Sequence, residues 1–138
     1  MSLYCTFYIE HLFFGVPVDH VQEVVRHQEM SRVPLAPPEV SGLINLRGQI
    51  VTAIDLRRRL RLQASVSEKR PMNVLIKTPE GAVSLLVDQI EDVLEVPEEG
   101  VERPPETLQG EVRSIITGAC KLKDRLLLLL DTQKTIEL

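Results

Sequence analysis

The sequence predicts a mainly β fold made of two similar lobes. Three kinds of observation support this: short stretches in which apolar and polar residues alternate, turn residues at hairpin positions, and an internal repeat. The chain has 138 residues, of which 43% are hydrophobic, which is enough to fill one core without help from metals or disulfides. We therefore expect a single domain over residues 1–138.

The N-terminus predicts a β-hairpin. Apolar and polar residues alternate from Leu3 to Ile9, as they do in a strand with one buried face. Glu10 and His11 follow as a tight turn, and Leu12 to Val16 reads as the returning strand.

A short helix is expected next, starting at Asp19. Asp19 and Gln22 have the spacing of a capping box, and valines follow at helical spacing at positions 21, 24 and 25. The proline-rich segment 34–38 can continue neither a helix nor a ladder of hydrogen bonds, so it predicts a surface loop.

A second hairpin is predicted around Arg47-Gly48. These two residues separate the apolar run 40–46 from residues 49–56, which are rich in β-branched side chains. A glycine that can adopt a positive φ is what a short hairpin turn requires.

Two segments of the chain repeat later in the same order. Residues 18–25 are echoed by residues 87–94, an offset of 69 (87 minus 18), and residues 42–55 by residues 118–131, an offset of 76 (118 minus 42). Arg47-Gly48 then aligns with Lys123-Asp124. The repeat predicts two lobes of about five short strands each, with a boundary near residues 57–75.

Composition argues against several classes of function. A net charge of −4 disfavours binding to nucleic-acid backbones and anionic membranes. The three histidines and two cysteines lack metal-ligand spacing, and Cys5 and Cys120 read as buried thiols. We find no phosphate loop, no glycine-flanked nucleophilic serine and no signal peptide. The longest apolar run, Leu126 to Leu130, is far shorter than the ~20 residues of a membrane span. We expect a cytoplasmic, non-enzymatic protein without cofactor or metal.

One basic cluster keeps a nucleic-acid-binding hypothesis open. Arginines at positions 57, 58, 59 and 61 could serve a small barrel that binds nucleic acid. Such a barrel would also need exposed aromatic residues, yet all five aromatic side chains lie between Tyr4 and Phe14. Two further hypotheses stay open at this point: a barrel that binds another protein ligand, and an enzyme.

Several of these segments together resemble the CheW family. The most specific match is Asn45-Leu46-Arg47-Gly48 followed by Ile50-Val51 and Asp55-Leu56, and the resemblance covers essentially the whole chain. It implies two intertwined five-stranded SH3-like barrels. It also implies an adaptor, recruited to receptor arrays, that couples the cytoplasmic tip of a methyl-accepting chemoreceptor to the regulatory domain of a CheA-type histidine kinase.

The resemblance also implies a binding site in a groove between the lobes. Matched residue by residue, the receptor-binding or kinase-binding positions are Val21, Glu23, Gly42, Asn45, Arg47 and Gly48. Val21 and Glu23 are expected on the short helix and the other four on the hairpin, with Arg47 and Glu23 fixing the orientation of a helical partner. The chain departs from the family pattern at Thr52-Ala53, where proline is common, and at Ala119-Cys120.

Overall fold

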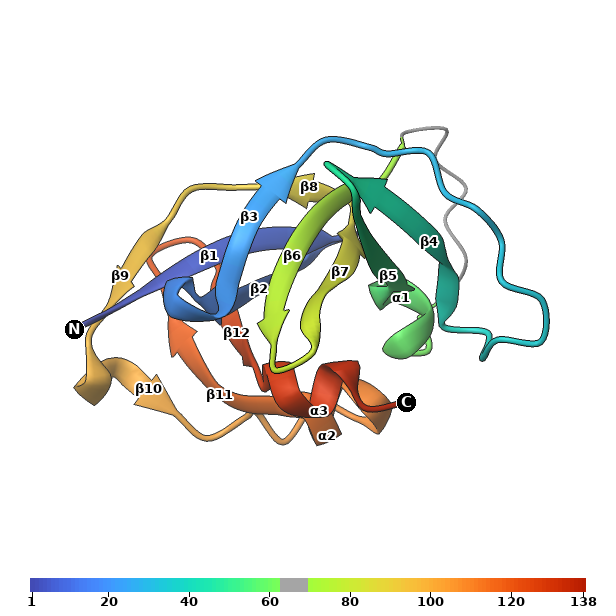
Figure 1. The fold of residues 1–138 in the computed structure, drawn as a ribbon. Coiled ribbons are helices and arrows are strands. Elements are labelled where there is room, and N and C mark those ends of the chain that lie inside the picture. The colour runs from blue at the N-terminus through green and yellow to red at the C-terminus, as the bar shows by residue number, and fades with distance from the viewer. Residues whose placement is uncertain (63–69) are drawn as a thin grey trace.

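The computed structural model describes residues 1–62 and 70–138, and its described part forms two curled β-sheets packed against each other (Figure 1). The first sheet has seven strands, in the order β10-β11-β12-β2-β1-β8 with β9 also paired to β1. Its strands are β1 (Ser2–Ile9), β2 (Leu12–Pro17), β8 (Gln89–Ile90), β9 (Leu94–Val96), β10 (Val101–Glu102), β11 (Ile116–Lys121) and β12 (Leu126–Leu130). The predicted mainly β class is confirmed.

The second sheet has five strands in the order β3-β6-β7-β5-β4. They are β3 (Val21–Val25), β4 (Val40–Leu46), β5 (Gln49–Asp55), β6 (Met72–Thr78) and β7 (Gly81–Val87). Short helical elements follow or connect the strands: α1 (Leu56–Arg59), α2 (Gly110–Ile115), α3 (Thr132–Ile136) and the 3₁₀ turns η1 (Val18–His20) and η2 (Glu98–Gly100).

The internal repeat appears in the structure in detail. The unit β4-β5-α1 corresponds to β11-β12-α3, and a bulge precedes Gly42 in one hairpin and Gly118 in the other. Each helix is also capped in the same way, because Asp55 accepts a hydrogen bond from the Arg58 N–H and Asp131 accepts one from the Lys134 N–H.

Each sheet combines strands from both repeats. The first hairpin, β1-β2, joins the sheet of the second repeat through parallel pairing of β2 with β12, and β6-β7 joins the first repeat's sheet through parallel pairing of β7 with β5. The chain passes between sheets at residues 17–21 and 87–89. The boundary expected near residues 57–75 must therefore be corrected: it separates the two repeats in the sequence, but it connects strands of one sheet. Part of it, residues 63–69, lies outside the described residues.

The helix expected from Asp19 is wrong. Only Val18–His20 form a 3₁₀ turn, capped at Pro17 without a side-chain hydrogen bond, and residues 21–25 form strand β3 against β6. Burial alternates along β3, so the valines follow the period of a strand. Valine is stiff at χ1 and favours strands, and the ladder with β6 outweighs a capping box at this position.

The matching segment of the second repeat also differs from a helix. It contains β8 and the start of β9, with an interruption at residues 91–93. There Glu91 N–H donates to the Thr6 carbonyl at 2.9 Å, and the Thr6 hydroxyl donates to the Asp92 carbonyl. This break, together with the two-residue β10, explains why the first sheet has seven strands where about five were expected.

The apolar core has three parts. One cluster fills the curl of the first sheet around Phe13 and Leu127, and a second fills the curl of the second sheet around Val51 and Leu75. The largest lies between the sheets and receives side chains from both, including Phe7, Phe14, Val74, Leu85 and Leu128. Packing of one lobe on the other therefore supplies much of the burial that stabilises this chain.

A buried arginine also ties the two sheets together. Arg57, on α1, has a side chain only 8% exposed and forms ion pairs with Glu10 and Asp88, at 2.5 Å for the Asp88 contact. Glu10 lies in the β1-β2 turn and its N–H donates to Asp88 at 2.7 Å. Burial alone would lower the pKa of Arg57, but the hydrogen bonds to Asp88 and Glu10 raise it overall.

We expect Arg57→Ala to lower the free energy of unfolding by about 1–3 kcal/mol, because it removes a largely buried side chain and its charged hydrogen bonds, while Glu10 and Asp88, 43% and 36% exposed, keep access to water. Arg58→Ala is the matched control, since its side chain is 61% exposed. Urea unfolding followed by circular dichroism measures both. A loss below ~1 kcal/mol for Arg57→Ala would show that water replaces the guanidinium.

We expect Leu128→Ala to lower the free energy of unfolding by about 2–5 kcal/mol, because it opens a cavity in the core between the sheets. Leu128 is 2% exposed, whereas Leu138, the control position, is 56% exposed. Thermal unfolding of Leu128→Ala and Leu138→Ala side by side tests this. Equal melting temperatures would contradict the assignment of Leu128 to the core.

Candidate functional site

The hairpin turn at Arg47-Gly48 has the geometry predicted from the sequence. Both residues have positive φ, 52° for Arg47 and 85° for Gly48, and Leu46 pairs with Gln49 across them. Two positive φ values in a two-residue loop are the mark of a type I′ turn. The Asn45 side chain accepts a hydrogen bond from the Gly48 N–H at 3.1 Å, so Asn45 and Gly48 stabilise the turn together.

The side chain of Arg47 extends from this turn to strand β3. Its Nη2 donates to both carboxylate oxygens of Glu23, at 2.5 and 2.6 Å. The Arg47 side chain is 66% exposed and that of Glu23 is 29% exposed. An ion pair so open to solvent contributes at most about 1 kcal/mol to stability, so its main effect is to fix where the two charged groups stand.

This ion pair joins the two ends of the five-stranded sheet. β3 and β4 are the end strands of that sheet, and Arg47 follows directly after β4. Beneath the pair, Val25 of β3 and Leu46 of β4 pack against the same apolar cluster. The sheet therefore curls until its end strands approach, and Glu23 and Arg47 mark the place where they meet at the surface.

The six residues predicted as a site divide into two groups. Glu23, Asn45, Arg47 and Gly48 are linked by hydrogen bonds at one end of this barrel. Val21 is half-buried against the large core cluster, and Gly42 is buried. A Cβ at Gly42 would lie 2.6 Å from the carbonyl oxygen of Ser31, which pairs with Leu43 beside it. Gly42 therefore allows the backbone at Ser31 to pair with β4.

The groove expected between the lobes stays a prediction. The space between the two sheets is filled by the large core cluster, and two surface hollows among the described residues are lined by residues other than the six predicted positions. The hydrogen-bonded group of four instead lies at an exposed barrel end.

Exposed apolar residues near this end were missed by the sequence interpretation. Val24 on β3 is 39% exposed and Ile50 on β5 is 60% exposed. Once residues 21–25 are assigned as a strand, alternation places Val24 on the face opposite Val25. The helical assignment concealed this signal.

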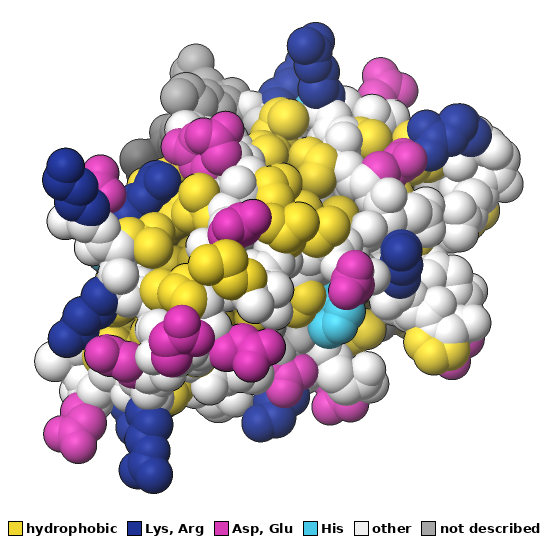
Figure 2. All heavy atoms as spheres, turned by 90° about the vertical axis from the view of Figure 1, so that its left-hand side faces the viewer, with side chains coloured by type: hydrophobic (Ala, Val, Ile, Leu, Met, Phe, Trp, Pro, Cys, Tyr) yellow, Lys and Arg dark blue, Asp and Glu magenta, His cyan; other side chains and the backbone are white. Residues whose placement is uncertain are grey.

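A second apolar surface lies over β1 and β9. Leu3 and Val93 are 48% and 54% exposed. Leu3 pairs with Glu95 of β9, and Val93 lies in the break just before that strand. Figure 2 shows hydrophobic side chains gathered across this face with acidic side chains among and around them. Segment 91–99 has exposed acidic residues at positions 92, 95, 98 and 99.

The basic cluster is largely engaged within the protein. Arg57 is buried in its ion pairs, and Arg59 donates to Glu111 at 2.7 Å and to the carbonyl oxygens of Lys134 and Thr135. The pKa of Glu111 is lowered, chiefly by the hydrogen bond from Arg59. These arginines do not form an open stripe for phosphates, which weighs against nucleic-acid binding.

The described residues contain no group of three or more His, Cys, Asp or Glu side chains arranged to hold a metal ion. Of the two thiols expected to be buried, Cys120 is buried but Cys5 is only half-buried, and burial raises the pKa of Cys5. Among the helices of residues 1–62 and 70–138, none has the length and hydrophobicity of a membrane span.

Two intertwined, curled sheets, each built from strands of both repeats, define a two-lobed SH3-like fold. The CheW-like domain model matches residues 3–138, so the chain belongs to the CheW family. It is 31% identical to the chemotaxis protein CheW of Bacillus subtilis over 124 residues, covering 90% of this chain and 80% of that protein. It is 28% identical to CheW of Treponema pallidum over 133 residues, covering 94% and 78%.

A solved structure confirms the fold. The crystal structure of the scaffolding protein TtCheW from Thermoanaerobacter tengcongensis superposes with a TM-score of 0.88, at 23% sequence identity. The match covers 99% of this chain and 93% of that one. The two-lobed arrangement predicted from the internal repeat is thus a shared feature of the two proteins.

We expect Gly42→Ala to destabilise the protein by about 1–3 kcal/mol, because the new methyl group meets a backbone oxygen. Ser41→Ala, at the neighbouring half-buried position, is the control, because it adds no atom near Ser31. Differential scanning calorimetry measures both variants. An unchanged melting temperature for Gly42→Ala would show that the loop at Ser31 moves aside freely.

Proposed function

We propose that this protein is a non-enzymatic adaptor that couples a chemoreceptor to a CheA-type histidine kinase. Membership of the CheW family supports the class. The observation that carries the proposal to particular residues is the Arg47–Glu23 ion pair, which holds two exposed charges at a barrel end where little stability is gained from them. Charges kept in a fixed place without a structural need are suited to recognition.

The receptor tip is proposed to bind as a helix against the outer side of β3. Val24 and Ile50 offer apolar contact there, and both are exposed. A helical partner would bury an apolar stripe on them, while Arg47 and Glu23 would set its register through charged hydrogen bonds. Burial would supply affinity and the charges would supply specificity.

The coupling is proposed to work by contact alone. The proposed partners are the cytoplasmic tip of a methyl-accepting chemoreceptor and the regulatory domain of the kinase, so the protein would act in the cytoplasm at receptor arrays. No cofactor, metal or nucleic acid takes part in this proposal.

We expect Arg47→Glu and Glu23→Arg each to weaken binding of a soluble receptor tip by roughly tenfold, since each places two like charges together. The double variant should recover much of the affinity, because it restores the pair with its charges exchanged. Isothermal titration calorimetry with the host's receptor tip measures the three variants against wild type.

The melting temperature of each variant is the control, because an exposed pair contributes little to folding. A double variant that melts like the wild type but does not recover binding would show that the partner contacts each charge individually. Wild-type protein that is folded yet binds neither the receptor tip nor the kinase would contradict the proposed function.

A further inference from the structure

The loop between β3 and β4 holds a leucine in an unfavourable conformation. Ala36 N–H donates to the Val33 carbonyl at 3.3 Å, Pro34 occupies the second position of this turn, and Leu35 at the third has φ 65°. A proline at the second position and a positive φ at the third are features of a type II turn, which favours glycine or asparagine at that third position. The Leu35 side chain is nevertheless fully exposed, at 105%. An apolar side chain is thus held in solvent on a strained backbone.

The loop is fixed at both ends. Ser31 and Leu43 exchange two backbone hydrogen bonds, at 2.9 and 2.8 Å, and Asp55 N–H donates to the Glu39 carbonyl at 2.8 Å. Prolines at 37 and 38 restrict the stretch between these anchors. A partner that binds Leu35 would therefore lose little conformational entropy in ordering this loop.

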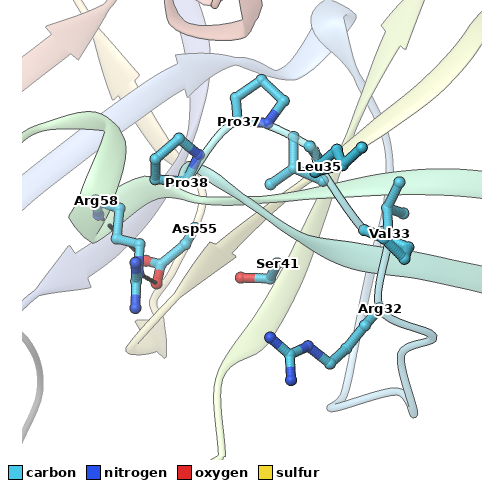
Figure 3. A pocket seen from close by; sticks show the side chains of 11 residues that line it. Arg32, Val33, Leu35, Pro37, Pro38, Ser41, Asp55 and Arg58 are labelled. Carbon is cyan, nitrogen blue, oxygen red and sulfur yellow. Dashed lines mark hydrogen bonds and ion pairs between the residues drawn. The ribbon is translucent and has the colours of Figure 1, made fainter.

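A hollow lies beneath the loop (Figure 3). Arg32 comes from the loop on one side, Arg58 from α1 on the other, and the hydroxyl of Ser41 lies between them. The lining contains one carboxylate, Asp55, which caps α1 and stands 3.6 Å from Arg58. Two guanidinium groups against one carboxylate leave the hollow with a positive charge, which suits a carboxylate from a partner.

The second repeat shows that the fold does not require this arrangement. In its corresponding connection, between β10 and β11, Leu108 packs against the large core cluster. Arg113 there donates to the Pro105 carbonyl at 2.7 Å, so this arginine is hydrogen-bonded within the β10-β11 connection. In the first repeat, by contrast, the leucine points outward and the arginines border an open hollow.

We propose that Leu35, Arg32 and Arg58 form a docking surface for an acidic protein partner, one that offers an apolar depression to Leu35 and a carboxylate to the two arginines. This surface lies at the opposite end of the β4-β5 hairpin from Arg47, roughly 20 Å away given about 3.3 Å per strand residue. A partner bound here leaves the Glu23–Arg47 end free.

The choice of partner rests on the proposed function. A coupling protein must hold two partners at once, and the receptor helix is proposed at the Glu23–Arg47 end. The docking surface is therefore assigned to the kinase. Its regulatory domain would offer an apolar depression to Leu35 and a carboxylate to Arg32 and Arg58.

The test measures binding of two purified probes, the regulatory domain of the host's CheA-type kinase and a soluble receptor tip, by isothermal titration calorimetry. Leu35→Gly removes the side chain and keeps a residue that adopts positive φ readily. Leu138→Gly is the control, because Leu138 is also exposed. We expect Leu35→Gly to weaken kinase binding about tenfold, with receptor binding unchanged and the melting temperature unchanged or raised.

Arg32→Glu provides an independent arm. We expect weaker kinase binding, with a smaller dependence on salt than the wild type shows. Kinase binding that survives both Leu35→Gly and Arg32→Glu would overturn the docking surface and leave the proposed function standing. A loss of receptor binding instead of kinase binding would overturn the assignment of the partner. Wild-type protein that binds no kinase would overturn both proposals.

Discussion

The fold depends on one constraint: neither repeat completes its own sheet. The parallel pairings of β2 with β12 and of β7 with β5 are where each repeat receives the hairpin of the other. Because each sheet contains strands from both repeats, the two repeats cannot separate without breaking the β2-β12 and β7-β5 ladders. The large apolar cluster and the buried Arg57 network then stabilise a contact that the chain connectivity already enforces.

Two arginines show how environment decides the role of a side chain. Arg57 and Arg47 both pair with carboxylates across different segments, but one is buried between sheets and the other stands in solvent. In the buried case the Arg57 guanidinium has little access to water and depends on Glu10 and Asp88 for its hydrogen bonds, so the pair is structural. In the exposed case water solvates both partners, and the pair fixes position at little energetic gain. Recognition is therefore expected at Arg47, and structural stability at Arg57.

Local patterns in the sequence predicted the elements that depend on local chemistry. Alternation identified β1, the turn at Glu10-His11 indicated β2, Gly48 has the expected positive φ, and the repeat predicted two lobes. The helix at Asp19 failed because the spacing of the valines fits both periods, and pairing with β6 decides between them. The approach of Glu23 to Arg47 depends on how the second sheet curls, which no local pattern predicts.

The intertwined connectivity sets the order in which the protein can mature on the ribosome. The hairpin β1-β2 is synthesised well before its parallel neighbour β12, because the whole second sheet lies between them in the sequence. Until then the edge of β2 and the apolar face of the hairpin have no partner, whereas the β3-to-β7 sheet can form from residues already made. Nascent chains should therefore contain one folded lobe and one hairpin that still lacks its partner strand. The unpaired edge of β2 is where a chaperone is expected to bind.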